Sequence, residues 1–217
     1  MENKDIIIDQ FKTMGEYIYD RVSSLPEINM ETLDINKTVL FIIDMNNGFA
    51  KKGSLYSDRI EKLINPIEIL VNDLKQKGAE IIAFTDYHTN ESIELLSYPK
   101  HCIYSTDEWQ LVDKLKSIEE IKVIKKNCTN GFLAKDFVIP ENKDNFIIVG
   151  DCTDICIYQF AITIKNYFNE NNIKKNIFVP LNLVDTFESE FHKGDFMNLV
   201  FLNSMIDNGI VVGNLKV

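Results

Sequence analysis

No apolar stretch in the sequence approaches the roughly 20 residues that a membrane span needs, so no membrane partner is expected. The charged start MENKD does not lead into the apolar core of a signal peptide, and we therefore expect a cytoplasmic protein. The four cysteines lack the paired spacing of small disulfide-rich domains, which favours reduced thiols. Clusters of lysine and arginine are missing too. Together with a net charge of -10, this argues against a nucleic-acid partner.

Low-complexity segments are also absent, and 217 residues with 45% hydrophobic content are most simply one domain with a sizeable core. We divide the chain into an N-terminal helical extension, residues 1–36, and a main domain, residues 37–217. Residues 3–25 of the extension carry an apolar stripe at helical spacing: Ile7, Phe11, Met14, Ile18, Val22 and Leu25. Pro26 ends this helix. The stripe must dock on its own domain or on a neighbouring subunit, which leaves a homo-oligomer open.

The main domain alternates predicted strands and helices. Short apolar runs predict six strands at residues 38–43, 79–85, 121–125, 146–149, 176–180 and 209–213. Helical spacing predicts helices at residues 59–77, 108–118, 153–168 and 193–205, the first with a restart at Asn65-Pro66 and an end at Gly78. Strands that alternate with helices pair in parallel through right-handed crossovers. We therefore predict a three-layer α/β/α fold with a six-stranded, mostly parallel, doubly wound sheet.

Polar residues follow the predicted strands at their carboxyl ends, where open parallel sheets bind ligands. Asp44 follows the first strand, Lys126 the third, and Cys156 the fourth, in the first turn of a helix that Thr153 or Asp154 could cap. The start of a helix favours a thiolate, the nucleophilic form of cysteine. Taken singly, a buried structural cysteine and a turn aspartate are the ordinary interpretations of Cys156 and Asp44.

A second group of polar residues follows the second strand. Asp86 and His88 alternate onto one side of an extended segment, and His101 follows after a loop that contains Glu94. Two histidines and one aspartate with an open position are typical of a divalent transition metal that still accepts a substrate or water. Scattered surface histidines are the alternative.

Five motifs occur together in a recognisable order: FIIDMNNGF, TDYH, YPKHC, KNCTNGF and GDCTDIC. On these motifs the sequence resembles the isochorismatase-like cysteine hydrolase superfamily over about residues 37–217, and within it the nicotinamidase branch. The segments TDYH and YPKHC favour nicotinamidases over isochorismatases proper, which lack that metal set. Two positions depart from the usual pattern, since Asn46 stands where glutamine is usual and Tyr98 where tryptophan is common.

The resemblance implies a role for each matched residue. Cys156 would be the nucleophile, Asp44 the proton acceptor and donor, and Lys126 the cation that holds the thiolate. The backbone N–H groups of Cys152 and Cys156 would form the oxyanion hole, with a cis peptide between Asp151 and Cys152. The remaining matches are metal ligands and aromatic residues: Asp86, His88 and His101 for zinc, iron or manganese, Glu94 as a further ligand in some members, and Phe49 and Tyr98 around the substrate ring.

Three functions follow as hypotheses. The leading one is a nicotinamidase, which converts nicotinamide to nicotinate and ammonia through a thioester acyl-enzyme. A related cysteine hydrolase that acts on another small amide or on isochorismate is the enzyme alternative. A thiol redox or metal-sensing protein that uses Cys152 and Cys156 is the alternative outside catalysis, although C-x-x-x-C is wider than the usual redox spacing.

Overall fold

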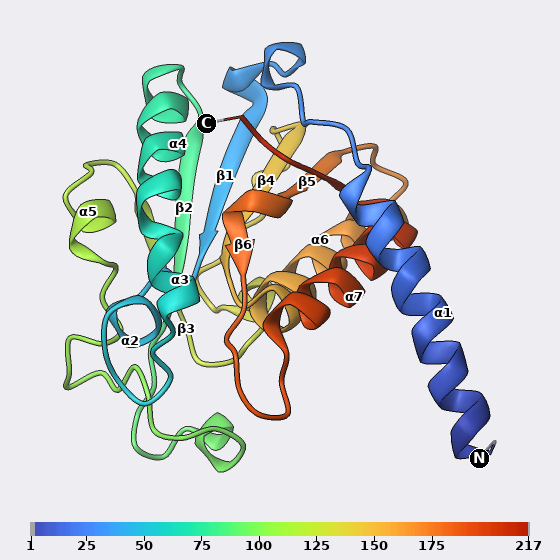
Figure 1. Ribbon diagram of the computed structural model, residues 1–217. Coiled ribbons are helices and arrows are strands. Elements are labelled where there is room, and N and C mark those ends of the chain that lie inside the picture. The colour runs from blue at the N-terminus through green and yellow to red at the C-terminus, as the bar shows by residue number, and fades with distance from the viewer. Residues whose placement is uncertain (1–2, 217) are drawn as a thin grey trace.

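The computed structural model describes residues 3–216, and it contains one layer of strands between two layers of helices (Figure 1). All strand pairs in the sheet are parallel, in the order β3-β2-β1-β4-β5-β7, with β6 paired to β4. The strands are β1 (Thr38–Ile43), β2 (Glu80–Asp86), β3 (Lys122–Lys126), β4 (Asn145–Asp151), β5 (Asn176–Pro180), β6 (Val184–Asp185) and β7 (Val211–Gly213). The predicted doubly wound fold is confirmed, and β6 is a two-residue strand that the sequence did not predict.

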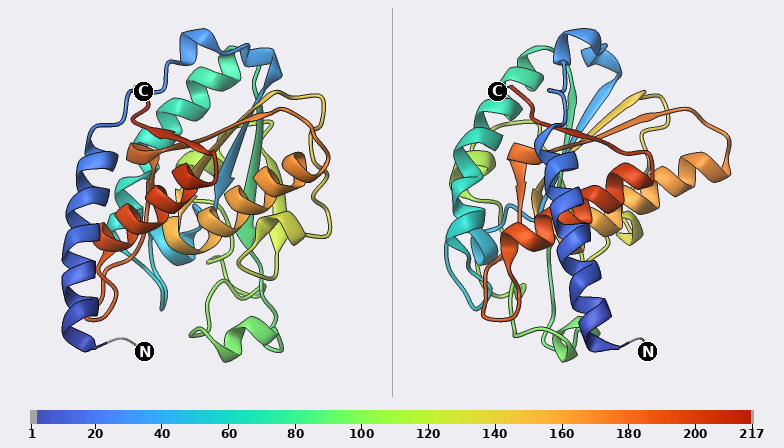
Figure 2. Two further views of the ribbon diagram at one scale, coloured as in Figure 1. Left: turned by 90° about the vertical axis from the view of Figure 1, so that its right-hand side faces the viewer. Right: turned by 45° about the vertical axis from the view of Figure 1, so that its right-hand side comes forward.

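Helices cover both faces of the sheet (Figures 1 and 2). One face carries α2 (Asn47–Ala50), α3 (Asp58–Lys62), α4 (Ile64–Gln76) and α5 (Asp113–Lys116), and the other carries α6 (Tyr158–Glu170) and α7 (Gly194–Asp207). The N-terminal helix α1 (Lys4–Ser23) lies outside α7. Within residues 3–216, no helix is both long and apolar enough to cross a bilayer.

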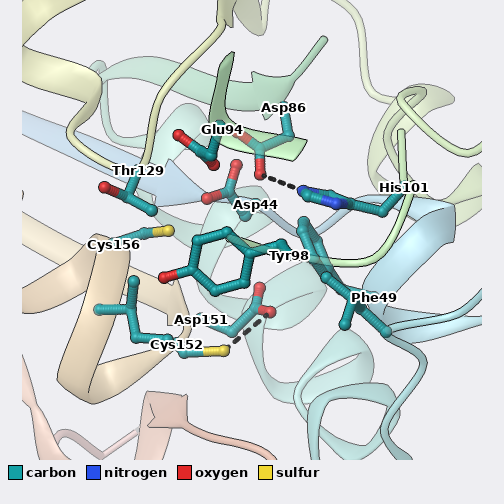
Figure 3. Close-up of a pocket in the computed structure, with 12 residues that line it drawn as sticks. Asp44, Phe49, Asp86, Glu94, Tyr98, His101, Thr129, Asp151, Cys152 and Cys156 are labelled. Atoms are coloured by element: carbon teal, nitrogen blue, oxygen red, sulfur yellow. Dashed lines mark hydrogen bonds and ion pairs between the residues drawn. The ribbon is translucent and has the colours of Figure 1, made fainter. Parts of the chain in front are cut away.

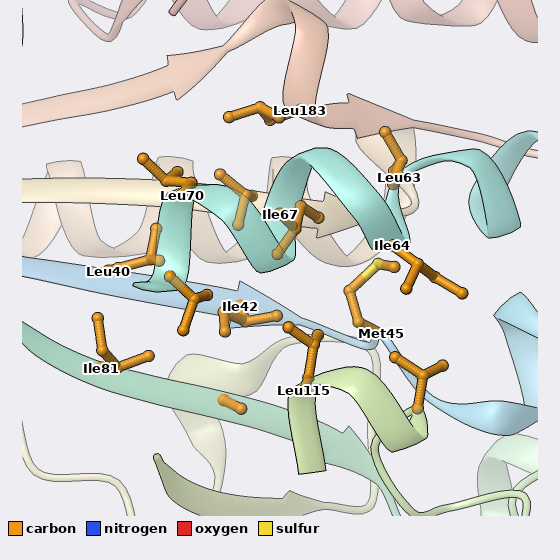
Figure 4. Close-up of a cluster of buried hydrophobic side chains, with 14 of the residues drawn as sticks. Leu40, Ile42, Met45, Leu63, Ile64, Ile67, Leu70, Ile81, Leu115 and Leu183 are labelled. Carbon is orange, nitrogen blue, oxygen red and sulfur yellow. The ribbon is translucent and has the colours of Figure 1, made fainter. Parts of the chain in front are cut away.

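The hydrophobic core has two halves, because side chains along a strand alternate between the faces of the sheet. Leu40 and Ile42 of β1 pack against α4, whose Ile67 and Leu70 are buried (Figure 4). Phe41 of the same strand points the other way, into the cluster under α6. Fully burying side chains of this kind stabilises the fold by roughly 1.5 to 3 kcal/mol each, which explains the continuous apolar runs of the central strands.

The predicted helix at residues 108–118 is wrong except for one turn, α5. The residues before α5 form backbone hydrogen bonds with the loop after β1 instead. Asn47 and Gly48 donate backbone hydrogen bonds to the carbonyls of Gln110 and Glu108, and Val112 donates to Met45. Leu111 also forms an antiparallel bridge with Asn46, so this segment runs alongside the loop after β1 instead of winding into a helix.

The predicted helix at residues 59–77 exists as two helices, with the break at Leu63 and a glycine end at Gly78, whose φ is 88°. Three strands also end later than predicted, and the first of them, β2, ends at Asp86. β3 includes Lys126 as its last residue, and β4 continues through Asp151. Both strands therefore carry their final polar residue inside the sheet rather than in the following loop.

The helix after β4 begins differently from the prediction. Residues Thr153–Ile157 form one π-helical turn before α6, and Cys152 is the residue that precedes it. Neither Thr153 nor Asp154 caps the helix, because the turn starts at Cys152 without a side-chain cap. Cys156 lies in this turn, at the start of the helical segment.

The order of strands along the sheet reverses between β1 and β4, which lie side by side and parallel although β2 and β3 come between them in the chain. Gly150 of β4 pairs with Ile43 of β1 and has a φ of 113°. A Cβ atom at Gly150 would lie 2.0 Å from the carbonyl oxygen of Ile43. Only glycine fits there, and its small size brings the ends of the two strands close together.

The N-terminal helix docks on its own domain through its C-terminal half. Ile18 and Val22 are buried against α7, and Arg21 Nη1 lies 2.6 Å from Asp207 Oδ1. The N-terminal half of the helix is not buried in the same way, since the side chain of Phe11 is 63% exposed and that of Met14 is 49% exposed. Within this chain the apolar stripe is therefore buried in its C-terminal half, and docking of the other half on a neighbouring subunit stays a prediction. The division at residue 36 stays a prediction, and its outer limits, residues 1–2 and 217, lie outside the described residues.

Candidate active site

Three of the predicted catalytic residues meet at the carboxyl ends of the strands. Lys126 Nζ lies 2.8 Å from Asp44 Oδ2 and 3.8 Å from Cys156 Sγ, and it also forms an ion pair with Asp86. All four side chains are buried. The parallel sheet explains this meeting, because β3, β2, β1 and β4 are neighbours and each ends at the same edge.

Burial determines the charges in this cluster. It raises the pKa of Asp44 to about 7, although the Lys126 ammonium opposes the shift. Burial also raises the pKa of the Cys156 thiol well above its ordinary value, which Lys126 offsets only in part. For Lys126 burial acts the other way, but the neighbouring acidic groups, Asp44 first, raise its pKa. Burial thus favours the neutral thiol of Cys156, against the helix start and Lys126, which favour the thiolate.

The carboxylate of Asp44 does not stabilise a turn by accepting hydrogen bonds from the backbone, as an ordinary turn aspartate would. Within the described chain, neither of its oxygens accepts a hydrogen bond from a backbone amide, and its contact is the ion pair with Lys126. Asp44 itself has a φ of 53°, a left-handed conformation in which its N–H still reaches the carbonyl of Phe84 at 3.1 Å. A buried carboxyl group with a pKa near neutrality, next to a thiol, is suited to accept and return a proton.

A second cluster lies beside the first. One potential ligand atom from each of Asp86, His88, Glu94 and His101 lies within 4.8 Å of the others. His88 Nε2 lies 3.8 Å from Asp86 Oδ2 and 3.9 Å from Glu94 Oε1, and His101 Nε2 lies 3.5 Å from Asp86 Oδ2. Asp86 belongs to both clusters, since its other oxygen faces Lys126. Lys126 and the two histidines lower its pKa although burial would raise it, so it stays ionised.

The hydrogen bonds of the two histidines fit a metal. His88 Nδ1 lies 2.8 Å from Asn127 Oδ1, and His101 Nδ1 lies 2.7 Å from the carbonyl oxygen of Pro99. Both partners only accept, so each Nδ1 carries the proton and each Nε2 is left with a lone pair toward Asp86. Among the described residues, His88 Nε2 is buried without a hydrogen-bond partner. Two imidazole nitrogens with two carboxylates suit zinc, iron or manganese.

The two clusters share one cavity of about 40 Å³ (Figure 3). Phe49 and Tyr98 lie on its wall, with ring centroids 5.6 Å and 6.2 Å from that of His101. A larger outer pocket of about 390 Å³ continues from it and has Phe49, Tyr98 and Cys152 in its wall as well. The remaining residues that line the inner cavity are Asp44, Leu55, Asp86, Glu94, His101, Thr129, Asp151, Ile155 and Cys156.

The sequence profile of the isochorismatase domain matches residues 38–205. The chain belongs to the isochorismatase family. The match begins with β1 and ends within α7, so α1 and the connector after it lie outside the matched region.

Relatives of this isochorismatase-family chain include amidases. Nicotinamidase 1 of Arabidopsis thaliana is 29% identical over 185 residues, which cover 75% of this chain and 71% of that protein. The pyrazinamidase of Pyrococcus horikoshii in complex with zinc has a TM-score of 0.69 at 21% identity, over 82% of this chain and 99% of that one. N-carbamoylsarcosine amidase from Thermoplasma acidophilum has a TM-score of 0.67 at 18% identity, over 82% and 95%. These two structures support the shared fold alone.

The site of this family member also contains residues that the sequence did not single out. Asp151 lines the cavity and is 1% exposed, burial raises its pKa well above the ordinary value, and its Oδ2 lies 3.8 Å from Cys152 Sγ. The expected cis peptide between Asp151 and Cys152 is present. A signal for Asp151 did exist, because like Asp44 it is an acidic residue that follows an apolar run. Asn127 gave no comparable signal beyond standing next to Lys126.

Proposed function

We propose that the protein is a nicotinamidase, which hydrolyses nicotinamide to nicotinate and ammonia through a thioester on Cys156. The observation that carries the proposal is the shared cavity: Asp86, Glu94 and His101, three of the four potential metal ligands, line the same space as Cys156 and Asp44. Membership of the isochorismatase family and the similarity to a plant nicotinamidase support the same reaction.

The first half of the reaction forms the thioester. Asp44 takes the proton from the Cys156 thiol, and Lys126 stabilises the thiolate that results. The sulfur attacks the amide carbon, and the backbone N–H groups of Cys152 and Cys156 hold the oxygen of the tetrahedral intermediate. Such donors typically contribute about 3 kcal/mol each to stabilising the transition state. Asp44 returns its proton to the amide nitrogen, the C–N bond breaks and ammonia leaves.

The second half releases the acid. Asp44, again a carboxylate, takes a proton from a water molecule that attacks the thioester carbon. The C–S bond breaks, Cys156 regains its proton from Asp44, and nicotinate leaves. A pKa of about 7 lets Asp44 exchange protons in both directions near neutral pH.

The ring of the substrate would be held on the other side of the cavity. Phe49 and Tyr98 offer aromatic faces to it beside His101. Asp86, His88, His101 and Glu94 would hold a divalent metal, which when bound supplies a Lewis acid for the pyridine nitrogen. Asp86 also pairs with Lys126, so the residues that orient the ring and those that move protons are connected.

The charge of the cavity disfavours isochorismate, the enzyme alternative. Carboxyl groups of Asp44, Asp86, Glu94 and Asp151 line the cavity. The lysine beside them is already paired with two carboxylates, Asp44 and Asp86. A substrate with two carboxylates would bring further negative charge into a buried acidic site, whereas a neutral amide would not.

Ammonia release from nicotinamide tests the proposal. We expect turnover with purified protein, loss of turnover after treatment with a chelator, and recovery when zinc, iron or manganese is returned. Isochorismate and a panel of other small amides should react at least about tenfold more slowly, a difference of about 1.4 kcal/mol in transition-state binding. Faster turnover of isochorismate or of another amide would overturn the assignment. Thiol-disulfide exchange by Cys152 and Cys156 without ammonia release would favour the redox alternative.

A further inference from the structure

The third histidine of the chain, His192, has no place in the proposed mechanism, yet it is bound to the turn that carries Cys156. His192 Nε2 lies 2.7 Å from Asp154 Oδ2 (the side chains are 17% and 4% exposed). Asp154 is inside the π turn, two residues before Cys156. The contact joins this turn to the segment between β6 and α7, which is remote in sequence.

The other side of the His192 ring is fixed as well. Its Nδ1 lies 3.0 Å from the carbonyl oxygen of Phe187, and its ring stacks on the Phe187 ring at 3.8 Å with an angle of 7°. The carbonyl only accepts, so Nδ1 carries a proton, and the pair must hold a further proton between Nε2 and the Asp154 carboxylate. Phe187 lines the outer pocket, together with Tyr98 and Cys152.

The segment that carries His192 is itself anchored to the domain. Arg59 of α3 donates to Asp185 Oδ1 at 3.1 Å and to the carbonyl of Thr186 at 3.0 Å, and Gly194 donates to Glu188 at 2.6 Å. The segment that carries His192 is therefore held in place by hydrogen bonds, and His192 can restrain the residues that it contacts, Asp154 and Phe187.

The turn around Cys156 packs against β4, α6 and α7, and its Ile157 is fully buried in the core. Within the turn the N–H groups of Ile155 and Ile157 both donate to the carbonyl of Cys152 at 3.1 Å, no side chain caps it, and the bond of Asp154 to His192 ties it to the segment before α7. Rotation of this turn would move Cys156 Sγ relative to Lys126 Nζ, now 3.8 Å away. A displacement of about 1 Å in an active site can slow a reaction by about 100-fold.

We propose that His192 is a positioning residue: through Asp154 it fixes the turn that places the Cys156 thiol, and through Phe187 it fixes the wall of the outer pocket. The proposal rests on the proposed function only in so far as Cys156 is the nucleophile. It assigns no chemical step to His192, which does not line the inner cavity.

Two substitutions separate the contacts of His192. In His192→Phe the aromatic ring can still stack on Phe187, but the bond to Asp154 is lost. We expect kcat for nicotinamide to fall by about 10-fold to 100-fold, with KM within about threefold, because the outer pocket keeps its wall. Asp154→Asn is the second substitution and should preserve the contact, because the amide N–H of asparagine can donate a hydrogen bond to Nε2 of a neutral His192. We expect it to retain at least about a fifth of kcat. Lys193→Ala, which removes the neighbouring surface lysine, is the matched control.

Alkylation of the cysteines gives a readout that does not depend on the substrate. Iodoacetamide labelling, followed by mass spectrometry of peptides, compares Cys156 with the partly exposed Cys128 and the buried Cys102 in one sample. In His192→Phe we expect labelling of Cys156 to slow at least about fivefold relative to Cys128, because a thiol moved away from Lys126 loses the cation that stabilises its thiolate. Cys102 should stay protected in this variant, and all rates should be unchanged in Lys193→Ala.

The outcomes separate the two proposals. An unchanged ratio of Cys156 to Cys128 labelling in His192→Phe overturns the positioning role, whatever the substrate proves to be. Rapid labelling of Cys102 in the same variant overturns it as well, because the fold as a whole would then have opened. Failure of the wild-type protein to hydrolyse nicotinamide, with a slowed Cys156 in His192→Phe, would reject the substrate and keep the positioning role.

Discussion

The two walls of the cavity are built in different ways. The nucleophile wall, residues 151–157, is one short stretch that continues β4 and leads into α6, and backbone hydrogen bonds to Cys152 hold it. The metal wall comprises Asp86, His88, Glu94 and His101, of which all but Asp86 belong to the loop after β2. Side-chain hydrogen bonds hold this loop together with a backbone bridge between His88 and Ile103: Ser92 Oγ and His88 Nδ1 both bond to Asn127 Oδ1, and the N–H of Cys102 donates to Glu108.

This difference teaches where each wall is vulnerable. A wall made largely by the backbone changes little when most side chains are replaced, except at the reacting atom and at a contact that fixes the turn, such as that of Asp154 with His192. A wall made by a loop depends on its polar contacts and on the ion that its ligands would share, because His88 Nε2 has no hydrogen-bond partner among the described residues. The predictions below test the two walls in order of decreasing effect.

The largest effect is expected from Cys156→Ala, which removes the reacting atom from the nucleophile wall. Turnover should fall by at least about 1,000-fold, since other nucleophile deletions cost as much or more. The melting temperature should stay close to that of the wild-type protein, measured by circular dichroism. Cys102→Ala, Cys128→Ala and Cys152→Ala are the controls and should keep substantial activity. Full activity of Cys156→Ala would reject the covalent mechanism.

His101→Ala should break the metal wall. We expect KM to rise and kcat/KM to fall on the order of 100-fold, because the ring is no longer oriented. A chelator should have the same effect on the wild-type protein. Zinc at about 100 times its Kd should stabilise the wild-type protein by about 2.7 kcal/mol, measured by thermal unfolding, and should stabilise His101→Ala less. Elemental analysis without a transition metal, together with no effect of chelator, would remove the metal site.

Asn127→Leu should weaken the same wall indirectly. Without an acceptor for His88 Nδ1, the ligand is free to rotate and change tautomer, and the Kd for zinc should rise by about 10-fold to 100-fold. Competition with a coloured chelator measures this change without any substrate. Asn127→Asp keeps an acceptor and should lose less affinity than Asn127→Leu. Equal affinities for all three proteins would show that Asn127 does not orient His88.

The pH dependence should report Asp44, which serves the nucleophile wall. Asp44 acts as a base only when ionised, and its pKa is raised to about 7, so kcat/KM should fall as pH drops below about 7. The slope should approach a tenfold loss per pH unit. An ordinary aspartate would place the fall near pH 4 instead. A profile that stays flat down to pH 5 would contradict the role of Asp44.

The smallest effect on turnover is expected from α1, which touches neither wall. Deletion of residues 1–25 should lower the melting temperature and spare kcat. Val22→Ala should cost about 1 to 3 kcal/mol of unfolding free energy, whereas Phe11→Ser should change it by less than about 0.5 kcal/mol. Sedimentation of the truncated protein tests the homo-oligomer: loss of an oligomer would assign the exposed half of α1 to a neighbouring subunit. Unchanged mass and melting temperature would contradict docking altogether.

Much of the fold and of the site could be predicted because the polar site residues lie at or just after the ends of apolar strands. Apolar runs identify β1, β2 and β4 without long-range information, and parallel pairing then gathers Asp44, Asp86 and the turn with Cys156 at one edge. The motifs add Phe49 and Tyr98, which do line the cavity.

The rest depended on contacts between remote segments. The helix expected at residues 108–118 is reduced to α5, because the residues before α5 pair with the loop that contains Asn47 and Gly48. The bond between Asp154 and His192 has no local pattern at all, and the charge of Cys156 depends on how deeply the site is buried. The depth at which a polar side chain is buried, and hydrogen bonds between segments that are remote in sequence, produce no pattern in residue spacing. Neither could therefore be predicted from the sequence.

The close approach of β1 and β4 at Gly150 also governs how the protein becomes active during folding. β1, β2 and β3 carry Asp44, Asp86 and Lys126 at or next to their ends, whereas the thiol of Cys156 reaches this cluster only when β4 pairs with β1. Pairing of strands that are distant along the chain is a slow step, since a long loop must close before the contacts repay it. A chain in which β4 is unpaired would thus contain these residues without a nucleophile beside them. The appearance of turnover marks the moment at which β1 and β4 have met.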